Sequence, residues 1–248
     1  MKTTKSYWDA AWQEEIRYRL PRNVTSSARN LQRLLRQRIK PGMRVLEIGF
    51  APGKMLAWVA KILQAKVAGI DYSDRGFSMA RRLFDVLHID ADLRHEDVFA
   101  ATFDPGSFDV VYSNGVIEHF DDPTEMVRRH VVLLKPGGLA LIAIPNYGGI
   151  YGRLQGFFDP GNLKIHNLDI MNPEALDRLA PLDLVSQVRT YPTGRISPWL
   201  INFDKKWPRL LALALSHMVN LAGLMQPLDW SPLCPMLMLE LRRNGSTP

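Results

Sequence analysis

Short apolar runs alternate with amphipathic stretches along much of the chain. The apolar runs predict strands at Arg44–Ile48, Lys66–Ile70, Asp92–His95, Phe108–Ser113 and Gly138–Ile144. Apolar residues at helical spacing predict helices at Lys54–Leu63, Asp74–Leu87 and Pro123–Leu134. Strands that alternate with helices in this way form βαβ units. The pattern therefore predicts an α/β fold with a mostly parallel sheet and helices on both faces.

The flanking regions have different patterns. Before the first strand, apolar residues at helical spacing predict a helix that ends at Pro41-Gly42: Val24, Ala28, Leu31, Leu35 and Ile39. After Pro145, residues 146–168 are rich in Gly, Asn and aromatics, and we expect a long functional loop there. A helix at Pro173–Leu179 and strands at Leu184–Thr190 and Pro235–Leu241 follow.

An insert at residues 191–231 separates the last two predicted strands. It contains the apolar stretch Leu210–Met225 and the tryptophans Trp199, Trp207 and Trp230. The stretch is shorter than the roughly 20 apolar residues that a membrane span needs, and Ser216, His217 and Asn220 interrupt it. We expect a buried cap helix here. The alternative is a helix that lies on a membrane surface.

Composition and charge fit one domain over residues 1–248. Its expected parts are a helical cap at 1–40, a ligand-binding core at 41–146, and a substrate-side region at 147–248 that includes the insert. Cys234 is the single cysteine, and the start of the chain has no apolar stretch, so we expect a cytoplasmic location. Residues 1–44 hold eleven basic and three acidic side chains. We interpret them as a solvated helix face, although a membrane surface, a nucleic acid or an acidic substrate could also be their partner.

The segment VLEIGFAPGK, residues 45–54, is a strand, a small-residue turn and a helix start. Glycines let the backbone approach a ligand, and a helix N-terminus offers free N–H groups, as in a Rossmann-like nucleotide site. The turn is E-x-G-x-A-x-G and not the G-x-G-x-x-G of dinucleotide sites. A carboxylate at Glu47 suits a ligand with an ammonium and a sulfonium, which points to S-adenosylmethionine. Candidate ligand contacts are Glu47, Gly49, Ala51 and Gly53.

Two acidic residues follow the next strands. Asp71 ends the second strand, where it can accept hydrogen bonds from both ribose hydroxyls, with Tyr72 beside the adenine. Asp97 follows the third strand and can accept from the adenine amino group, with Val98 against the ring. Asp97 can also cap a short helix, and the two roles are compatible.

The segment from Phe108 to Pro123 is a buried strand followed by a polar turn. Ligands of open α/β sheets bind at this edge. We expect Ser113 and Asn114 to line the methionine end and the reacting methyl group. His119 comes shortly after and is expected in the wall of the site.

Five segments resemble, in order, the motifs of the class I S-adenosylmethionine-dependent methyltransferases. They are LEIGFAPG, GIDYS, EDVF, SNGVIEH and LKPGGLALIAIPN, between Pro41 and Asn146. The resemblance is closest to the branch of the ubiquinone-biosynthesis O-methyltransferases and many natural-product enzymes. One departure is Ala51, where the family usually has Gly. KIHNLDIMNPEAL, residues 164–176, also resembles a stretch of this branch, which places His166 near the substrate mouth.

The resemblance implies a seven-stranded sheet with a final antiparallel strand and a helical cap insert. It also implies S-adenosylmethionine as cofactor, bound by Glu47, Gly49, Ala51, Gly53, Asp71, Asp97 and Asn114. The acceptor is expected to be a small, partly apolar molecule that is methylated on oxygen, in a pocket that Tyr7, Trp8 and Trp12 help to close. A hydroxyl or phenol acceptor needs a base, for which His119, His166 and Tyr147 are the candidates, whereas a carboxylate needs none.

Several alternatives remain open. The acceptor atom could be nitrogen or carbon, or the chain could be a non-catalytic binding protein. The chain could also be an NAD-dependent oxidoreductase, but the sequence of the turn after the first strand argues against this. We expect no metal site, because Asp121-Asp122-Pro123 is more simply a turn and helix start. Nucleic acid is not expected as substrate, since the fourth motif lacks the Asn/Asp-Pro-Pro-aromatic turn of DNA adenine methyltransferases. Peripheral membrane contact stays open, as does the oligomeric state.

Overall fold

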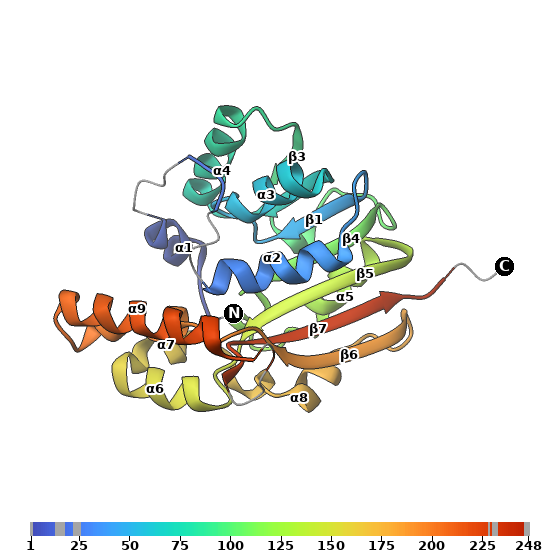
Figure 1. Cartoon of the computed structure of the whole chain (residues 1–248). Coiled ribbons are helices and arrows are strands. Elements are labelled where there is room, and N and C mark those ends of the chain that lie inside the picture. Colours follow the sequence, from blue (N-terminus) through green and yellow to red (C-terminus); the bar gives the residue numbers. More distant parts are fainter. Residues whose placement is uncertain (1, 13–17, 22–25, 228, 230–232, 246–248) are drawn as a thin grey trace.

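The computed structural model describes residues 2–12, 18–21, 26–227, 229 and 233–245. Its centre is a seven-stranded sheet in the order β3-β2-β1-β4-β5-β7-β6 (Figure 1). The strands are β1 (Arg44–Ile48), β2 (Lys66–Asp71), β3 (Ala91–His95), β4 (Phe108–Asn114), β5 (Leu134–Pro145), β6 (Val185–Thr193) and β7 (Met236–Arg243). Strands β1 to β5 pair in parallel, and β7 runs antiparallel to both β5 and β6. The predicted fold class is confirmed.

Helices cover both faces of the sheet because its strands carry apolar side chains on both sides. On one face lie α2 (Ser26–Arg38), α3 (Lys54–Leu63) and α4 (Asp74–Val86), packed on a core that includes Val45, Val67 and Val110. On the other face, α5 (Thr124–Val132) and α8 (Pro173–Asp177) pack against Leu46 and Val111. Val24, expected in the helix that is now α2, lies outside the described residues.

The expected loop at 146–168 is wrong. The chain instead forms α6 (Ile150–Phe158) and α7 (Pro160–Lys164). Gly152 and Gly156 lower the helical propensity of this stretch, but Tyr151 and Phe158 are buried in the core, and this packing outweighs propensity. Short 3-10 turns lie within four other connections of the described chain: η1 (Val98–Ala100), η2 (Ile117–His119), η3 (Leu168–Ile170), η4 (Pro198–Leu200) and η5 (Phe203–Lys205).

The apolar insert does form a helix, α9 (Arg209–Met225), but its expected burial is wrong. Only Ala212 and Gly223 of this helix are buried, whereas Leu210 is 83% exposed and Met225 is 86% exposed. In the described part of the chain, no helix combines the length and the apolar character that crossing a membrane requires. Trp230 and Ser231, assigned to this insert from the sequence, lie outside the described residues.

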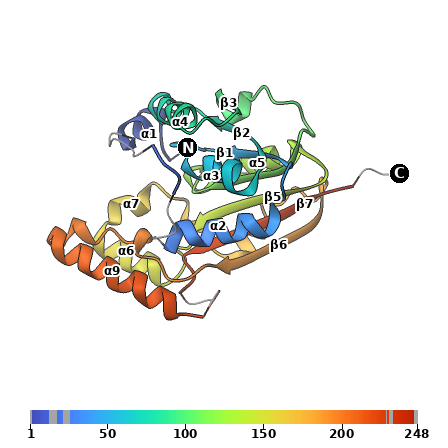
Figure 2. The same cartoon turned by 45° about the horizontal axis from the view of Figure 1, so that its top comes forward.

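The topology brings several segments to one end of the sheet. Figures 1 and 2 show α6, α7 and α9 gathered there, with α1 (Lys5–Ala11) nearby. This is the end at which the parallel strands terminate, because the residues that close β1, β2, β4 and β5 line one cavity together with residues of α1 and α7. Ligands of open α/β sheets bind at such an edge.

Candidate active site

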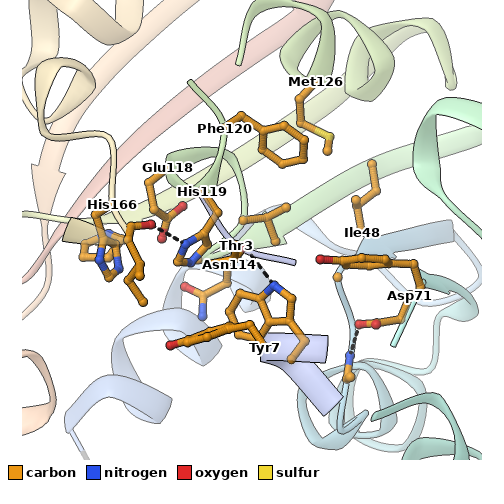
Figure 3. A pocket seen from close by; sticks show the side chains of 18 of the residues that line it. Thr3, Tyr7, Ile48, Asp71, Asn114, Glu118, His119, Phe120, Met126 and His166 are labelled. Carbon is orange, nitrogen blue, oxygen red and sulfur yellow. Dashed lines mark hydrogen bonds between the residues drawn. The ribbon is translucent and has the colours of Figure 1, made fainter. Parts of the chain in front are cut away.

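A cavity of about 450 Å³ opens at the carboxyl ends of the parallel strands. Ile48, Asp71, Asn114 and Pro145, at the ends of four strands, form its floor. Figure 3 shows Asp71 at one side of the cavity, and Glu118, His119 and His166 grouped at the other. The cavity therefore has an acidic end and a histidine-containing end.

Asp71 organises the acidic end. Its Oδ2 accepts a hydrogen bond from the Ala51 N–H (3.0 Å), and its Oδ1 accepts one from the Ser73 N–H (2.9 Å). Both donors belong to the turns that follow β1 and β2, so this carboxylate fixes two turns at once. Burial raises the pKa of Asp71, while these two N–H donors oppose the rise. A carboxylate has about four lone-pair positions, so two stay available to a ligand.

Most of the other predicted cofactor residues also line this end. Gly49 and Ala51 do so after β1, and Tyr72, Asp97 and Val98 do so after β2 and β3. The side chain of Asp97 accepts from the Phe99 N–H (2.9 Å) and caps η1, as its alternative role predicted. Its second oxygen remains available to a ligand.

Glu47 does not line the cavity. Strand alternation turns its side chain away from the face of Leu46 and Ile48, into the core beneath α3. There its Oε2 accepts a hydrogen bond from the Tyr112 hydroxyl (2.7 Å). Burial raises the pKa of Glu47 to about 8. Its predicted contact with a ligand ammonium is therefore corrected to a buried structural role.

Gly53 and Ser113 are also absent from the cavity wall. The Ser113 hydroxyl is 2.9 Å from Nε2 of His130, a fully buried residue of α5 whose Nδ1 donates to the Met126 carbonyl (2.8 Å). Gly53 has φ of +86°, and a Cβ there would lie 2.9 Å from the Cβ of Ala80. The two residues therefore support helix packing, and their predicted ligand contacts are corrected. Asn114, the neighbour of Ser113, does line the cavity, as expected.

The two predicted histidines meet at the opposite end. The ring centroids of His119 and His166 are 4.8 Å apart. Each Nδ1 lies next to a backbone carbonyl, of Ile165 for His119 (2.9 Å) and of Asn162 for His166 (2.7 Å). Because a carbonyl only accepts, each Nδ1 must carry the proton, and each Nε2 keeps a free lone pair. Burial lowers both pKa values, that of His119 to about 4, so both rings are neutral near neutral pH.

Glu118 was not expected in the site. It is only 1% exposed, yet it lines the cavity, and neither carboxylate oxygen has a hydrogen-bond partner in another described residue. Burial raises its pKa to about 8. Ligand atoms of Glu118, His119 and His166 all lie within 4.8 Å of one another. The sequence signal was the EH pair within SNGVIEH, but only the fold brings His166 to it.

Aromatic residues complete this end of the cavity. The third predicted base, Tyr147, lines it, and its hydroxyl accepts from the Asn162 side chain (3.2 Å). Burial raises the pKa of Tyr147 to about 12, so this group is a hydrogen-bond donor and not a base near neutral pH. Tyr7, Trp8 and Trp12 line the cavity from the N-terminal segment, as expected.

The N-terminal segment is attached directly to the histidine end. The Lys2 N–H donates to the His119 carbonyl (2.7 Å), and the Trp8 ring meets the His119 ring edge-on at 5.0 Å between centroids. The Trp8 indole N–H also donates to the Thr3 hydroxyl (3.1 Å). These contacts hold aromatic side chains over the site.

A Rossmann-like sheet with acidic residues after its second and third strands is typical of the class I S-adenosylmethionine-dependent methyltransferases. A family model described as a methyltransferase domain matches residues 12–180, which is more than half of the chain. The chain belongs to this family, and the family resemblance found in the sequence is confirmed.

Two curated relatives each match less than half of the chain. Phosphoethanolamine N-methyltransferase 2 of Caenorhabditis elegans is 35% identical over 118 residues, which cover 46% of this chain and 26% of the relative. A ubiquinone biosynthesis O-methyltransferase of Ruegeria pomeroyi is 34% identical over 105 residues, 42% of each protein. The chain thus spans less than half the length of these relatives, which methylate different atoms by name.

Solved structures support the fold. Phosphoethanolamine N-methyltransferase 2 of Haemonchus contortus, in complex with phosphomonomethylethanolamine and S-adenosylhomocysteine, has a TM-score of 0.59 and 20% identity. The match covers 88% of this chain and 52% of that one. A structure described under the conversion of a disulfide bond into a thioacetal group during echinomycin biosynthesis has a TM-score of 0.60 and 17% identity, with 98% and 94% coverage.

Proposed function

We propose that this chain transfers the methyl group of S-adenosylmethionine to an oxygen of a small, partly apolar molecule. The observation that carries the proposal is one cavity that joins an acidic end to an end with two neutral imidazoles and aromatic walls. The first end suits the ribose and adenine of the cofactor. The second suits an acceptor with a hydroxyl or phenol group.

In this proposal the acidic end binds the adenosine. The two free lone-pair positions of Asp71 accept from the ribose hydroxyls, and Asp97 accepts from the adenine amino group. Tyr72 and Val98 pack on the ring, while Gly49 and Asn114 border the methionine part. This turn requires glycine at position 49, because its φ is positive (+71°) and an added Cβ would lie 2.7 Å from Cγ2 of Val116.

The transfer is an in-line displacement, which the protein promotes mainly by positioning and by excluding water. The acceptor oxygen forms a bond to the methyl carbon as the carbon–sulfur bond breaks, and the sulfonium becomes a neutral thioether. The acceptor proton passes to a free Nε2 of His119 or His166. Tyr147 donates a hydrogen bond to the acceptor, and those described residues of the segments 1–40 and 147–248 that line the cavity close the acceptor side.

One observation favours a second candidate, methylation of an amine. Glu118 offers a buried carboxyl group with no hydrogen-bond partner in another described residue, and aromatic rings of Trp8 and Tyr147 lie near the neighbouring histidines. A cationic amine binds well between a carboxylate and aromatic faces. In this case Glu118 would act as counter-ion to the amine.

The exposed apolar side chains of α9 support a finer proposal for location, peripheral contact with a membrane. Leu210, Met218 and Leu221 are each more than 60% exposed, and the basic Lys205, Lys206 and Arg209 precede or begin the helix. Sedimentation with anionic vesicles checks this. A variant with serine at the three apolar positions should lose vesicle binding, and equal binding by both proteins would refute the contact.

The activity is tested with methyl-labelled S-adenosylmethionine and a mixture of phenols, alcohols, carboxylic acids and amines. We expect S-adenosylhomocysteine to bind and NADH, the control ligand, not to bind. The label should appear in an O-methyl product. Label on nitrogen alone would favour the second candidate. Cofactor binding without any transfer would indicate a binding protein, and NADH binding in place of S-adenosylhomocysteine would refute the proposal.

A further inference from the structure

Glu118, His119 and His166 form a group of three potential metal ligands inside the cavity. The first two lie in η2, and the third follows α7. One carboxylate oxygen and two imidazole nitrogens lie within 4.8 Å of one another, so small side-chain rotations bring all three onto one ion. Two histidines and one carboxylate are a recurrent ligand set for divalent transition metals.

The hydrogen bonds of the two histidines prepare them for this role. Metal-bound histidines usually donate their other ring N–H to a carbonyl or carboxylate, which fixes the tautomer and the ring orientation. His119 and His166 donate from Nδ1 to the carbonyls of Ile165 and Asn162. Their Nε2 lone pairs are therefore held ready for a ligand.

Asn167 joins the two segments that carry the group. Its N–H donates to the Glu118 carbonyl (2.6 Å), and its side-chain NH₂ donates to the carbonyls of Phe120 (3.1 Å) and Asp121 (3.0 Å). These bonds span the chain between η2 and the loop of His166. The backbones of all three ligands are thus fixed relative to one another.

The carboxyl group of Glu118 is the second, independent observation. It is almost completely buried, it faces the cavity, and its oxygens have no hydrogen-bond partner in another described residue (Figure 3). Burying such a group without a partner is costly. A cation between it and the two imidazoles would remove this cost.

We propose that Glu118, His119 and His166 bind one divalent first-row transition metal ion. Mixed nitrogen and oxygen ligands favour Zn²⁺, Fe²⁺, Co²⁺ or Mn²⁺ over Mg²⁺ and Ca²⁺, which prefer oxygen alone. Three protein ligands leave positions open toward the cavity. This proposal rests on the function proposed above and deepens it. A hydroxyl acceptor bound to the metal ion would lose its proton to water more easily. His119 and His166 would then act as metal ligands instead of bases.

Titration of the full chain with Co²⁺ tests the site, after treatment with a chelator and without acceptor or cofactor. We expect one ion per chain, with visible absorption bands typical of nitrogen ligands. Glu118→Gln and His166→Ala should each weaken binding by at least about tenfold, since even second-shell changes cost metal sites 10–100-fold. His217→Gln is the matched control, because this exposed histidine lies on α9, outside the cavity.

Circular dichroism and S-adenosylhomocysteine affinity show whether each variant is folded. Absence of saturable binding to the folded chain would overturn the proposal, as would equal binding by the wild type and both site variants. Binding that only His217→Gln abolishes would assign the ion to the surface and would also overturn it. Because Co²⁺ binding is measured without cofactor, its result is separate from the result of the methyl-transfer assay. The chain could transfer methyl groups without binding Co²⁺, or bind Co²⁺ without transferring methyl groups.

Discussion

Replacing Asp71 by asparagine tests the acidic end of the cavity with almost no change in side-chain size. In the wild type, the carboxylate accepts from the N–H groups of Ala51 and Ser73 at 3.0 and 2.9 Å. The proposed ribose hydroxyls would use its remaining lone pairs. Asparagine has one acceptor oxygen, and its NH₂ group would face an N–H donor of one turn. The variant therefore loses a ribose contact and weakens one turn.

The expected loss follows from these contacts. Hydrogen bonds to a charged group contribute about 1.5–3 kcal/mol each. Losing one of the two ribose bonds should therefore weaken binding of S-adenosylhomocysteine by about tenfold or more, since about 1.4 kcal/mol corresponds to a factor of ten. Isothermal titration calorimetry measures this change directly.

Asp85→Asn is the matched control for this measurement. Asp85 lies on the exposed side of α4, on the helix that follows the Asp71 turn, and does not line the cavity. We expect its affinity to stay within about twofold of the wild type. An Asp71→Asn protein that is folded and binds as tightly as this control would remove Asp71 from the cofactor site.

Three further changes separate structural from ligand-binding roles. Ser113→Ala should lower the free energy of unfolding by about 1–3 kcal/mol in a urea titration, because buried His130 loses its partner, while cofactor affinity stays unchanged. Glu47→Gln tests the carboxyl whose pKa burial raises to about 8 from an ordinary 4.5. Protonated Glu47 stabilises the fold fully below about pH 4.5, and this stabilisation is lost as the pH rises toward 8. The free energy of unfolding of the wild type should therefore fall by several kcal/mol relative to that of Glu47→Gln across this range. Parallel pH profiles of the two proteins would contradict this. Trp8→Ala should raise the acceptor KM more than the cofactor Kd, because its ring packs on His119; the opposite order in steady-state and binding assays would place Trp8 at the cofactor end.

Much of the sheet could be predicted from the sequence because its strands are short apolar runs separated by helical patterns. The segment of α6 did not show such a pattern. Its glycines resemble a loop, and only the burial of Tyr151 and Phe158 makes it helical. For α9 the sequence indicated an apolar helix correctly. It could not show whether other parts of the protein would cover that helix.

The site could be predicted in part, for a similar reason. Asp71 and Asp97 follow strands directly, so topology alone brings them to one edge. Glu47 and Ser113 lie within strands, where the direction of a side chain depends on strand alternation and on which helix packs there. Glu118 was missed because His166, its other neighbour in the cavity besides His119, comes from another part of the chain.

A crystal structure with S-adenosylhomocysteine bound would show directly which end of the cavity holds the adenosine. We expect the ribose hydroxyls within hydrogen-bond distance of Asp71, the adenine beside Asp97 and Val98, and the sulfur facing the space next to Asn114 and His119. A ligand in the reverse orientation, with adenine against Glu118 and His166, or a ligand bound outside this cavity, would contradict this expectation.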